Sequence, residues 1–302
     1  MAVFCLFHLP LVAMEHVLST MNAQQLIDLS MVSVRSKNAV TNFLRIRRKL
    51  RVLLGVLEEP YISIAGKQRL FHRIFKYSEN PIEEWMKTYD YIRKVLGFRF
   101  EYVRFEFDSF PSQNRQIINY LLLIQTSIDR LEVISGREKC NDDVQYLLNN
   151  LKVFDRLVLQ LNHYKEDSQL DIPNDPHYLH INNSKFINYE QFLKLTHVKI
   201  AFNLSILTNQ EINRFLKSWM ACESHYKLEV FQVNIPNQEA IEEIMDLPHE
   251  VTTDPSIMNM FVGLPFNINP TEGFNIKRSD GKMATACVAE KSNGWNLCLL
   301  IH

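Results

Sequence analysis

The sequence predicts a mixed chain (α+β, with α/β alternation), in which a small helical module precedes a sheet of strands and helices. Over residues 9–37, apolar residues recur at steps of three and four, which is the spacing of amphipathic helices. Further along, strand-like runs in which apolar and polar residues alternate are separated by amphipathic helical segments. This is the pattern of a parallel sheet covered by helices. We therefore expect residues 1–50 to form the helical module and residues 51–302 the sheet, which ends in a β-meander.

Two short helices are expected within residues 9–37. Pro10 suits the first position of a helix, where a backbone N–H has no partner to lose. The second helix has its own start signal, because Asn22 is a favoured N-cap residue and Gln25, three positions later, completes a capping box. Met21 and Leu26 flank this box as a hydrophobic staple.

A basic run follows at residues 45–51 (RIRRKLR), with five positive charges in seven residues. Apolar residues recur behind these charges at helical spacing and supply a buried face: Phe43, Ile46, Leu50 and Leu53. We interpret the run as the solvated face of a third helix. The alternatives are a nuclear address and a phosphate-binding patch.

Residues 52–77 contain short strand-like runs separated by turn residues. A helix is then expected from Asn80, as N-cap, through about Leu96, with Pro81 at its first position and Gly97 at its end.

The next part alternates strands and helices at a spacing of roughly 22–30 residues, close to that of leucine-rich repeats. Strands are expected at Glu101–Phe107, Arg130–Ile134, Arg156–Leu161, Tyr178–Asn182, His197–Ala201 and Leu228–Val233. Helices are expected at Ser112–Gln125, Asn141–Leu151 and Thr208–Met220, the last with a capping box of Thr208 and Glu211. An irregular leucine-rich-repeat-like stack is the most economical architecture, and a compact α/β domain is the alternative.

The tail contains two turn signals. Asp280-Gly281 is a preferred pair for a two-residue hairpin turn, and Asn293-Gly294 is a second signal. The runs around them predict a β-meander over residues 274–301, which would close the C-terminal end of the sheet as a cap closes a repeat stack.

Alternate side chains of a strand point to opposite faces of its sheet, so each expected strand has a helix-facing set and an open-face set. The open-face set is polar and carries both signs of charge, which favours a protein as the bound target. The candidate target-binding residues are Arg104, Glu106, Glu132, Arg156, Gln160 and Lys199. A plain solvated face is the alternative for each of them.

Composition limits the possible functions. A net charge of −1 predicts neither nucleic acid nor an anionic membrane as a partner. The five cysteines are scattered without a CxxC pair, which suits a reducing compartment. The apolar N-terminus lacks a preceding positive charge and is too short to span a bilayer. We therefore expect an intracellular protein, located in the cytoplasm, the nucleus or both.

The sequence carries no catalytic or cofactor signature, so we expect neither enzyme activity nor a cofactor. His177 and His180 have the spacing of metal ligands, with Asp171 and Asp175 nearby, but we interpret this segment as a polar loop without a metal. An enzyme would instead require a deep pocket with clustered titratable groups.

Residues 9–37 resemble the F-box, and Leu9 and Pro10 match its opening pair. Its apolar positions are matched by Met14, Val17, Leu18 and Met21 in the first helix and by Leu26, Ile27, Leu29, Ser30, Val32 and Ser33 in the second. Three positions depart from the motif, since an acidic residue, Asp and Trp are usual at Val12, Gln25 and Ser36. The alternative is a helical hairpin that packs only on its own domain.

An F-box implies docking onto a Skp-type adaptor within a cullin-based ubiquitin ligase. The residues that this resemblance assigns to adaptor contact are Leu9, Pro10, Met14, Val17, Leu18, Leu26, Ile27, Leu29 and Ser30.

Residues 181–234 resemble the type 2 F-box-associated domain of the large nematode F-box family. The resemblance rests on Leu193, on the strand 198–200, on LTNQEINRFLKSW at 207–219 and on Leu228-Glu229, and the tail NIKRSDGKMATA at 275–286 is similar too. Together the two resemblances imply a substrate receptor of an SCF-type ligase, which binds a protein target of unknown identity through its C-terminal region. The alternative is a repeat-type interaction protein without a ligase role.

Overall fold

The structure is a computed structural model that describes residues 6–47, 50–65, 70–74, 79–136, 141–162, 170–263 and 267–302. It divides into two compact units, Met1–Glu132 and Val133–His302. The expected limits, 1–50 and 51–302, refer to functional modules rather than compact units, and they stay a prediction.

The first unit begins with a 3₁₀ turn, Leu6–His8, and the helices α1 (Leu11–Thr20), α2 (Ala23–Val32) and α3 (Val34–Arg47). Asn22 and Gln25 form the expected capping box, each backbone N–H donating to the other side chain at 2.9 Å. Pro10 was expected inside the first helix, but it is the residue before α1, because its ψ of 147° is extended. The apolar helical face expected to extend from Phe43 to Leu53 is also wrong, because α3 ends at Arg47 and Leu53 lies in a strand.

Leu53 belongs to the first strand in the part of the mixed sheet that the first unit contributes. The strands of this part are β1 (Arg51–Val56), β2 (Tyr61–Ala65), β3 (Leu70–Ile74) and β4 (Phe100–Glu106), in the order β3-β2-β1-β4. Strand β1 is antiparallel to β2 and parallel to β4. Part of the basic run, residues 48 and 49, lies outside the described residues.

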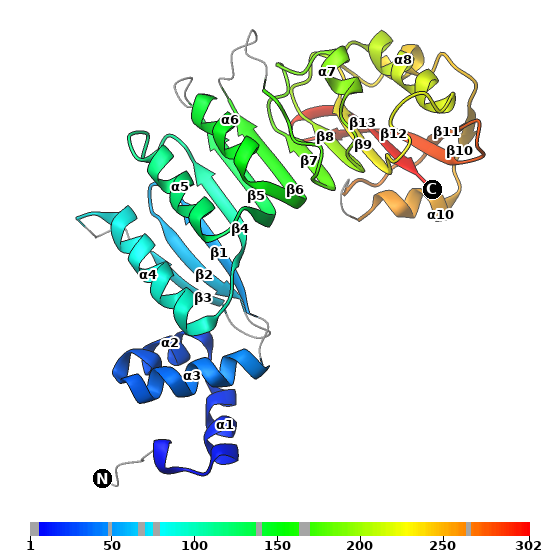
Figure 1. Ribbon diagram of the computed structural model, residues 1–302. Helices are drawn as coiled ribbons and strands as arrows, with labels where there is room; N and C mark the ends of the chain where they lie inside the picture. The colour runs from blue at the N-terminus through cyan, green and yellow to red at the C-terminus, as the bar shows by residue number, and fades with distance from the viewer. Residues whose placement is uncertain are drawn as a thin grey trace. The chain divides into compact units, whose positions relative to one another are not determined.

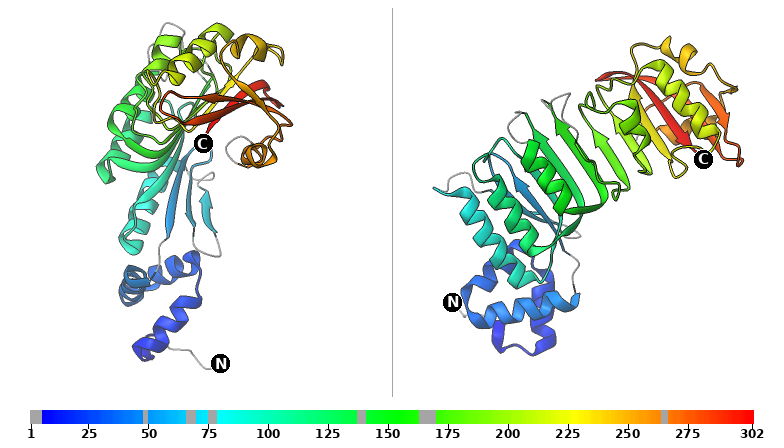
Figure 2. Two further views of the ribbon diagram at one scale, coloured as in Figure 1. Left: turned by 90° about the vertical axis from the view of Figure 1, so that its right-hand side faces the viewer. Right: turned by 45° about the horizontal axis from the view of Figure 1, so that its top comes forward.

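Helices α4 (Pro81–Leu96) and α5 (Asn114–Ile124) lie on one face of this sheet (Figures 1 and 2). Both expected ends of α4 are confirmed, since Asn80 accepts from the Glu83 N–H and Gly97 ends the helix with a φ of 69°. Helix α4 also packs against the N-terminal helices α2 and α3, and the hydroxyls of Ser30 and Tyr91 are 2.9 Å apart.

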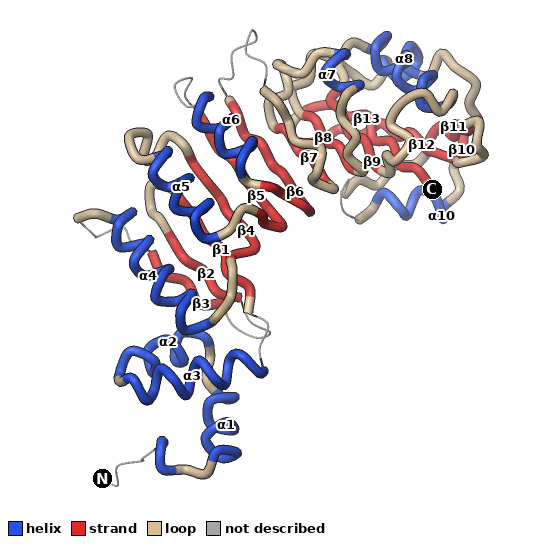
Figure 3. The backbone as a smooth tube through the Cα atoms, viewed as in Figure 1, coloured by secondary structure: helices blue, strands red, loops and turns tan. Residues whose placement is uncertain are grey.

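In the second unit, four consecutive strands run parallel to one another: β6 (Lys152–Leu161), β7 (Tyr178–Ile181), β8 (Lys199–Phe202) and β9 (Val230–Asn234). Strand β5 (Ser127–Ser135) contains the boundary between the units. The helices of the alternation are α6 (Asn141–Asn150), α7 (Tyr189–Leu193) and α8 (Asn209–Met220), which Figure 3 labels, and α9 (Ala240–Ile244). Each expected strand and helix is confirmed to within a few residues, although α7 and α9 were not expected.

The expected meander is confirmed, and it extends the sheet from β9. Strands β13 (Gly294–Ile301), β12 (Met283–Lys291), β11 (Gly273–Lys277) and β10 (Glu250–Thr252) follow in that order, each antiparallel to the previous one. Strand β10 was not expected. Helix α10 (Pro255–Met258) and the 3₁₀ turn Asn259–Phe261 contribute to an apolar cluster with Val230, Cys287 and Cys298.

The expected two-residue turn at Asp280-Gly281 is wrong. Arg278 N donates to Lys282 O at 2.8 Å, so three residues form the loop, and Gly281 takes the left-handed position with a φ of 97°.

The chain thus has an N-terminal helical region followed by a large mixed β-sheet with helices. Its assignment to the leucine-rich-repeat class stays a prediction. Across the described residues, no helix combines the length and the apolar character that crossing a bilayer requires.

Candidate functional site

The N-terminal helices divide the candidate adaptor residues into a buried and an accessible group. Leu18, Leu26, Ile27 and Ser30 are at most 2% exposed, so they pack inside the helical region. Leu9, Met14, Val17 and Leu29 are partly exposed, and Pro10 is exposed. Only this second group offers surface to a partner in the structure.

Two exposed apolar patches lie beside these residues and were missed by the sequence reasoning. One is the first turn of α1, where Leu11 is 65% and Val12 80% exposed. The other is the junction of α2 and α3, where Met31, Val32 and Val34 are 51%, 75% and 76% exposed. Apolar side chains gathered at a surface are typical of interaction sites. The signal in the sequence was Val12 itself, an apolar residue at a position where the F-box motif has an acidic one.

On the open face of the first unit, two of the three candidate charges form an ion pair and the third has a hydrogen bond. Glu132 accepts from the Tyr102 hydroxyl, and its other oxygen lies 3.6 Å from Arg104 Nε. Burial, followed by the hydrogen bond to Glu132, raises the pKa of Tyr102. Glu106 accepts from the Ser109 hydroxyl at 2.5 Å. These three candidates therefore have intramolecular partners.

On the open face of the second unit, the candidate Arg156 contacts an aromatic ring instead of an opposite charge. The Arg156 guanidinium lies 4.5 Å from the centre of the Tyr178 ring, and Tyr178 is in register with both Arg156 and Lys199. Burial raises the pKa of the Tyr178 hydroxyl. Phe154, two residues before Arg156 on the same strand, is 49% exposed. Gln160, the remaining candidate, is partly exposed near the end of β6.

An amide network occupies the carboxyl ends of β7 and β8. Asn203 Nδ2 lies 3.2 Å from Asn182 Oδ1 and 3.3 Å from His180 Nε2, and Asn203 Oδ1 accepts from Asn293 at 2.8 Å. Asn296 joins the network through Asn293, at 3.1 Å. These bonds fix the edge of the open face next to the Arg156–Tyr178–Lys199 row.

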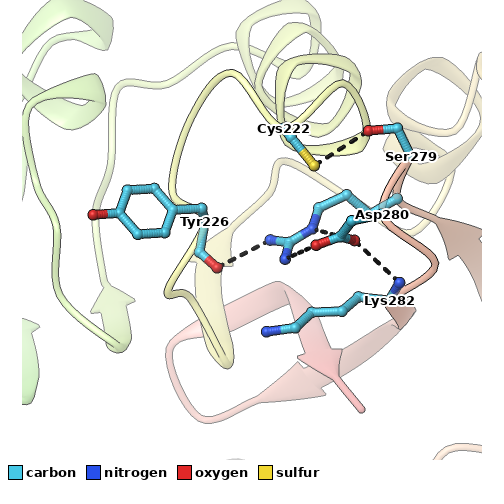
Figure 4. A network of polar contacts seen from close by, with 6 residues as sticks. Cys222, Tyr226, Ser279, Asp280 and Lys282 are labelled. Carbon is cyan, nitrogen blue, oxygen red and sulfur yellow. Dashed lines mark hydrogen bonds and ion pairs between the residues drawn. The ribbon is translucent and has the colours of Figure 1, made fainter.

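The tail hairpin is anchored to the end of α8 (Figure 4). Arg278 bonds both oxygens of Asp280, donates to the Tyr226 carbonyl at 3.0 Å and lies 5.1 Å from the Trp219 ring centre. Ser279 donates to Cys222 Sγ at 3.2 Å. The two segments whose sequences resemble one family, 207–219 and 275–286, are therefore in contact.

Comparison with protein families gives two matches, in the expected order. The F-box domain model matches residues 6–48, and the model described as F-box associated matches residues 167–233. The chain carries an F-box domain followed by an F-box-associated domain. No curated protein and no solved structure matches it. Neither family match bears on a nematode origin.

Within the F-box domain, the departures from the usual motif have structural explanations. Gln25 closes the capping box of α2, a role that depends on its amide oxygen. Ser36, where Trp is usual, is buried, and its hydroxyl lies 2.6 Å from that of Ser33. Val12 is at the surface and contributes to the first apolar patch.

The F-box-associated match covers β7, β8 and most of β9, together with α7 and α8. Tyr178 and Lys199 lie inside it, whereas Arg156 precedes it and the tail hairpin follows it. F-box and F-box-associated families are substrate-recognition or adaptor proteins rather than enzymes. Within the ranges that the structure describes, no three His, Cys, Asp or Glu side chains gather in a way that could hold a metal ion.

Proposed function

We propose that this chain is the substrate receptor of an SCF-type ubiquitin ligase. The F-box domain binds a Skp-type adaptor, which connects the chain to the cullin core, and the C-terminal region binds a target protein. The observation that carries the proposal is the order of the two matched domains, an F-box at 6–48 and an F-box-associated domain at 167–233. The mechanism is proximity, because a target held beside activated ubiquitin reacts as if intramolecularly.

Adaptor contact is assigned to the accessible side chains of the F-box domain. Leu11 and Val12 join Leu9, Pro10, Met14 and Val17 around α1, while Met31, Val32 and Val34 extend the surface near Leu29. Burying this apolar surface against a partner would supply the binding free energy. The buried members, such as Ile27, act by holding α2 in place.

The test is co-purification with a Skp-type adaptor. Leu11→Asp/Val32→Asp places two charges on the two apolar patches, and Leu123→Asp/Leu204→Asp is the matched control, because Leu123 and Leu204 are 86% and 52% exposed outside the F-box domain. We expect capture of the wild type and the control, and loss of capture for the patch variant, with unchanged circular dichroism throughout. A folded wild type that is not captured contradicts the proposal.

A second candidate function is an interaction module without a ligase role. The parallel strand–helix succession from β6 to β9 favours it, since such stacks often serve as binding surfaces. It predicts target binding without adaptor capture. Under either function, we expect no cofactor, no nucleic acid or membrane partner, and an intracellular location in the cytoplasm, the nucleus or both.

A further inference from the structure

A patch of aromatic and cationic side chains crosses three parallel strands of the second unit. The β6–β8 patch consists of Phe154 and Arg156 on β6, Tyr178 on β7 and Lys199 on β8. Register aligns Arg156, Tyr178 and Lys199 in one row. Since neighbouring strands are about 4.8 Å apart, the backbones of the two cationic residues are roughly 10 Å apart, with Tyr178 between them.

This row lies on the face opposite the helices. The residues that alternate with it, Leu157, Leu179 and Ile200, are fully buried and belong to the helix-facing side. The row itself is partly or fully exposed. The same strand side of β6 carries Phe154, whose ring is 5.5 Å from Lys152 Nζ.

Within the part of the chain that the structure describes, the positive charges of the β6–β8 patch have no ion-pair partner. Among the described residues, Arg156 forms a cation–π contact with Tyr178 but no ion pair, and Lys199 forms no ion pair. The neighbouring Lys152, by contrast, lies 3.0 Å from Asp175 Oδ1. Arg104 on the other open face is paired with Glu132. Uncompensated charge is therefore concentrated at Arg156 and Lys199.

The polar groups described next to the patch do not neutralise the charges of Arg156 and Lys199. Lys291, a further cation of the same face, donates to Gln232 Oε1 at 2.8 Å and is partly buried, so its ammonium is already bonded. The amide network of Asn182 and Asn203 is neutral. Aromatic residues and arginine are the side chains most often enriched at protein interfaces.

We propose that the β6–β8 patch binds an acidic segment of the target protein. Two carboxylates of that segment lie near Arg156 and Lys199, and an apolar side chain packs against Phe154. The proposal rests on the proposed function in that the bound segment belongs to the substrate of the ligase.

The test uses the full-length chain and a pool of short fluorescein-labelled peptides, in which two Glu residues are fixed at varied separations and the other positions are randomised. A second pool has Gln in place of both Glu residues. Arg156→Gln/Lys199→Gln removes the two charges of the patch. Lys194→Gln/Lys217→Gln is the matched control, because it removes the same charge from exposed residues at the end of α7 and on α8.

We expect the Glu pool to bind the wild type about tenfold more tightly than it binds the patch variant, because two exposed ion pairs are lost. The control variant should bind as the wild type does, and salt should weaken binding. Equal binding of the Glu and Gln pools, or equal loss in the control variant, would overturn the proposal.

Adaptor capture by the same protein preparations separates the two proposals. Capture without preference for the Glu pool leaves the ligase function standing and removes the acidic target. Preference for the Glu pool without adaptor capture supports the acidic-segment site but contradicts the ligase function, so the chain would be an interaction module.

Discussion

The Arg278 guanidinium holds Asp280 by both carboxylate oxygens, with Nε donating to Oδ1 at 2.9 Å and Nη2 donating to Oδ2 at 2.7 Å. Arg278 is only 3% exposed, and its remaining amino group donates to the Tyr226 carbonyl. A planar guanidinium can satisfy these acceptors together, whereas a lysine ammonium cannot. The tail hairpin and the segment after α8 are therefore fixed to each other by one side chain.

Replacing Arg278 by lysine should lower the free energy of unfolding by about 1–3 kcal/mol, because charge is kept but the paired hydrogen bonds are lost. Urea unfolding followed by circular dichroism measures the change. Lys277→Arg, at an exposed neighbouring position, is the control and should leave the midpoint unchanged. Equal stability of Arg278→Lys and wild type would show that the paired geometry contributes nothing.

The same pairing predicts the titration of Asp280. The hydrogen bond from Arg278 lowers the pKa of Asp280 to about 2. A lowered carboxyl pKa stabilises the fold above the ordinary value of about 3.9, and this contribution is lost as the pH falls through about 2. Carboxyl-carbon NMR should find Asp280 still ionised at pH 3, and Arg278→Lys should move its pKa upward. A pKa that the variant leaves unchanged would assign the shift to another cause.

Features that depend on residues close in sequence could be predicted. The capping boxes of Asn22 with Gln25 and of Thr208 with Glu211 each need only a three-residue spacing, and both are present. Burial within the F-box domain could not be predicted in the same way. Periodicity places Ile27 on an apolar stripe but cannot show that it is 2% exposed while Val32 is 75% exposed, because that depends on packing between helices.

The open face shows the same limit. Alternation along single strands identified Arg104, Glu132, Arg156 and Lys199 as open-face residues. Whether each charge is neutralised depends on the register between strands, which pairs Arg104 with Glu132 and leaves Arg156 beside Tyr178. Sequence could therefore name the candidates, and only the fold could rank them.

Gly55 should not tolerate a side chain. It is the register partner of Tyr61, and a Cβ at residue 55 would overlap the Tyr61 ring. That ring also contacts His72, with 4.9 Å between ring centres, so moving it disturbs β3. Gly55→Ala should lower the free energy of unfolding by about 1–3 kcal/mol, as overpacking does. Gly263→Ala is the control, since no atom of the described residues lies within 4 Å of its added Cβ. Thermal unfolding of both variants makes the comparison, and equal melting temperatures would contradict the expected overlap.

Two buried histidines should make the chain sensitive to acid. His225 packs against Phe192 and Phe215, with ring centres 4.6 and 5.1 Å apart, and burial lowers its pKa to about 4. His197 bonds the Pro173 carbonyl at 3.0 Å, and burial lowers its pKa to about 4 as well. Between these values and the ordinary pKa of about 6.5, the unfolded chain binds more protons than the folded one.

The free energy of unfolding should therefore fall as the pH drops from about 6.5 to about 4, by up to about 1.4 kcal/mol per pH unit for each histidine. Urea unfolding at a series of pH values measures this slope. His225→Asn removes one titrating ring and keeps a residue that tolerates the φ of 48°, so its slope should be shallower. Cys222→Asn, at another left-handed residue with a φ of 60°, removes no histidine and should keep the wild-type slope. A His225→Asn slope equal to that of the wild type would mean that His225 already takes up its proton in the folded state.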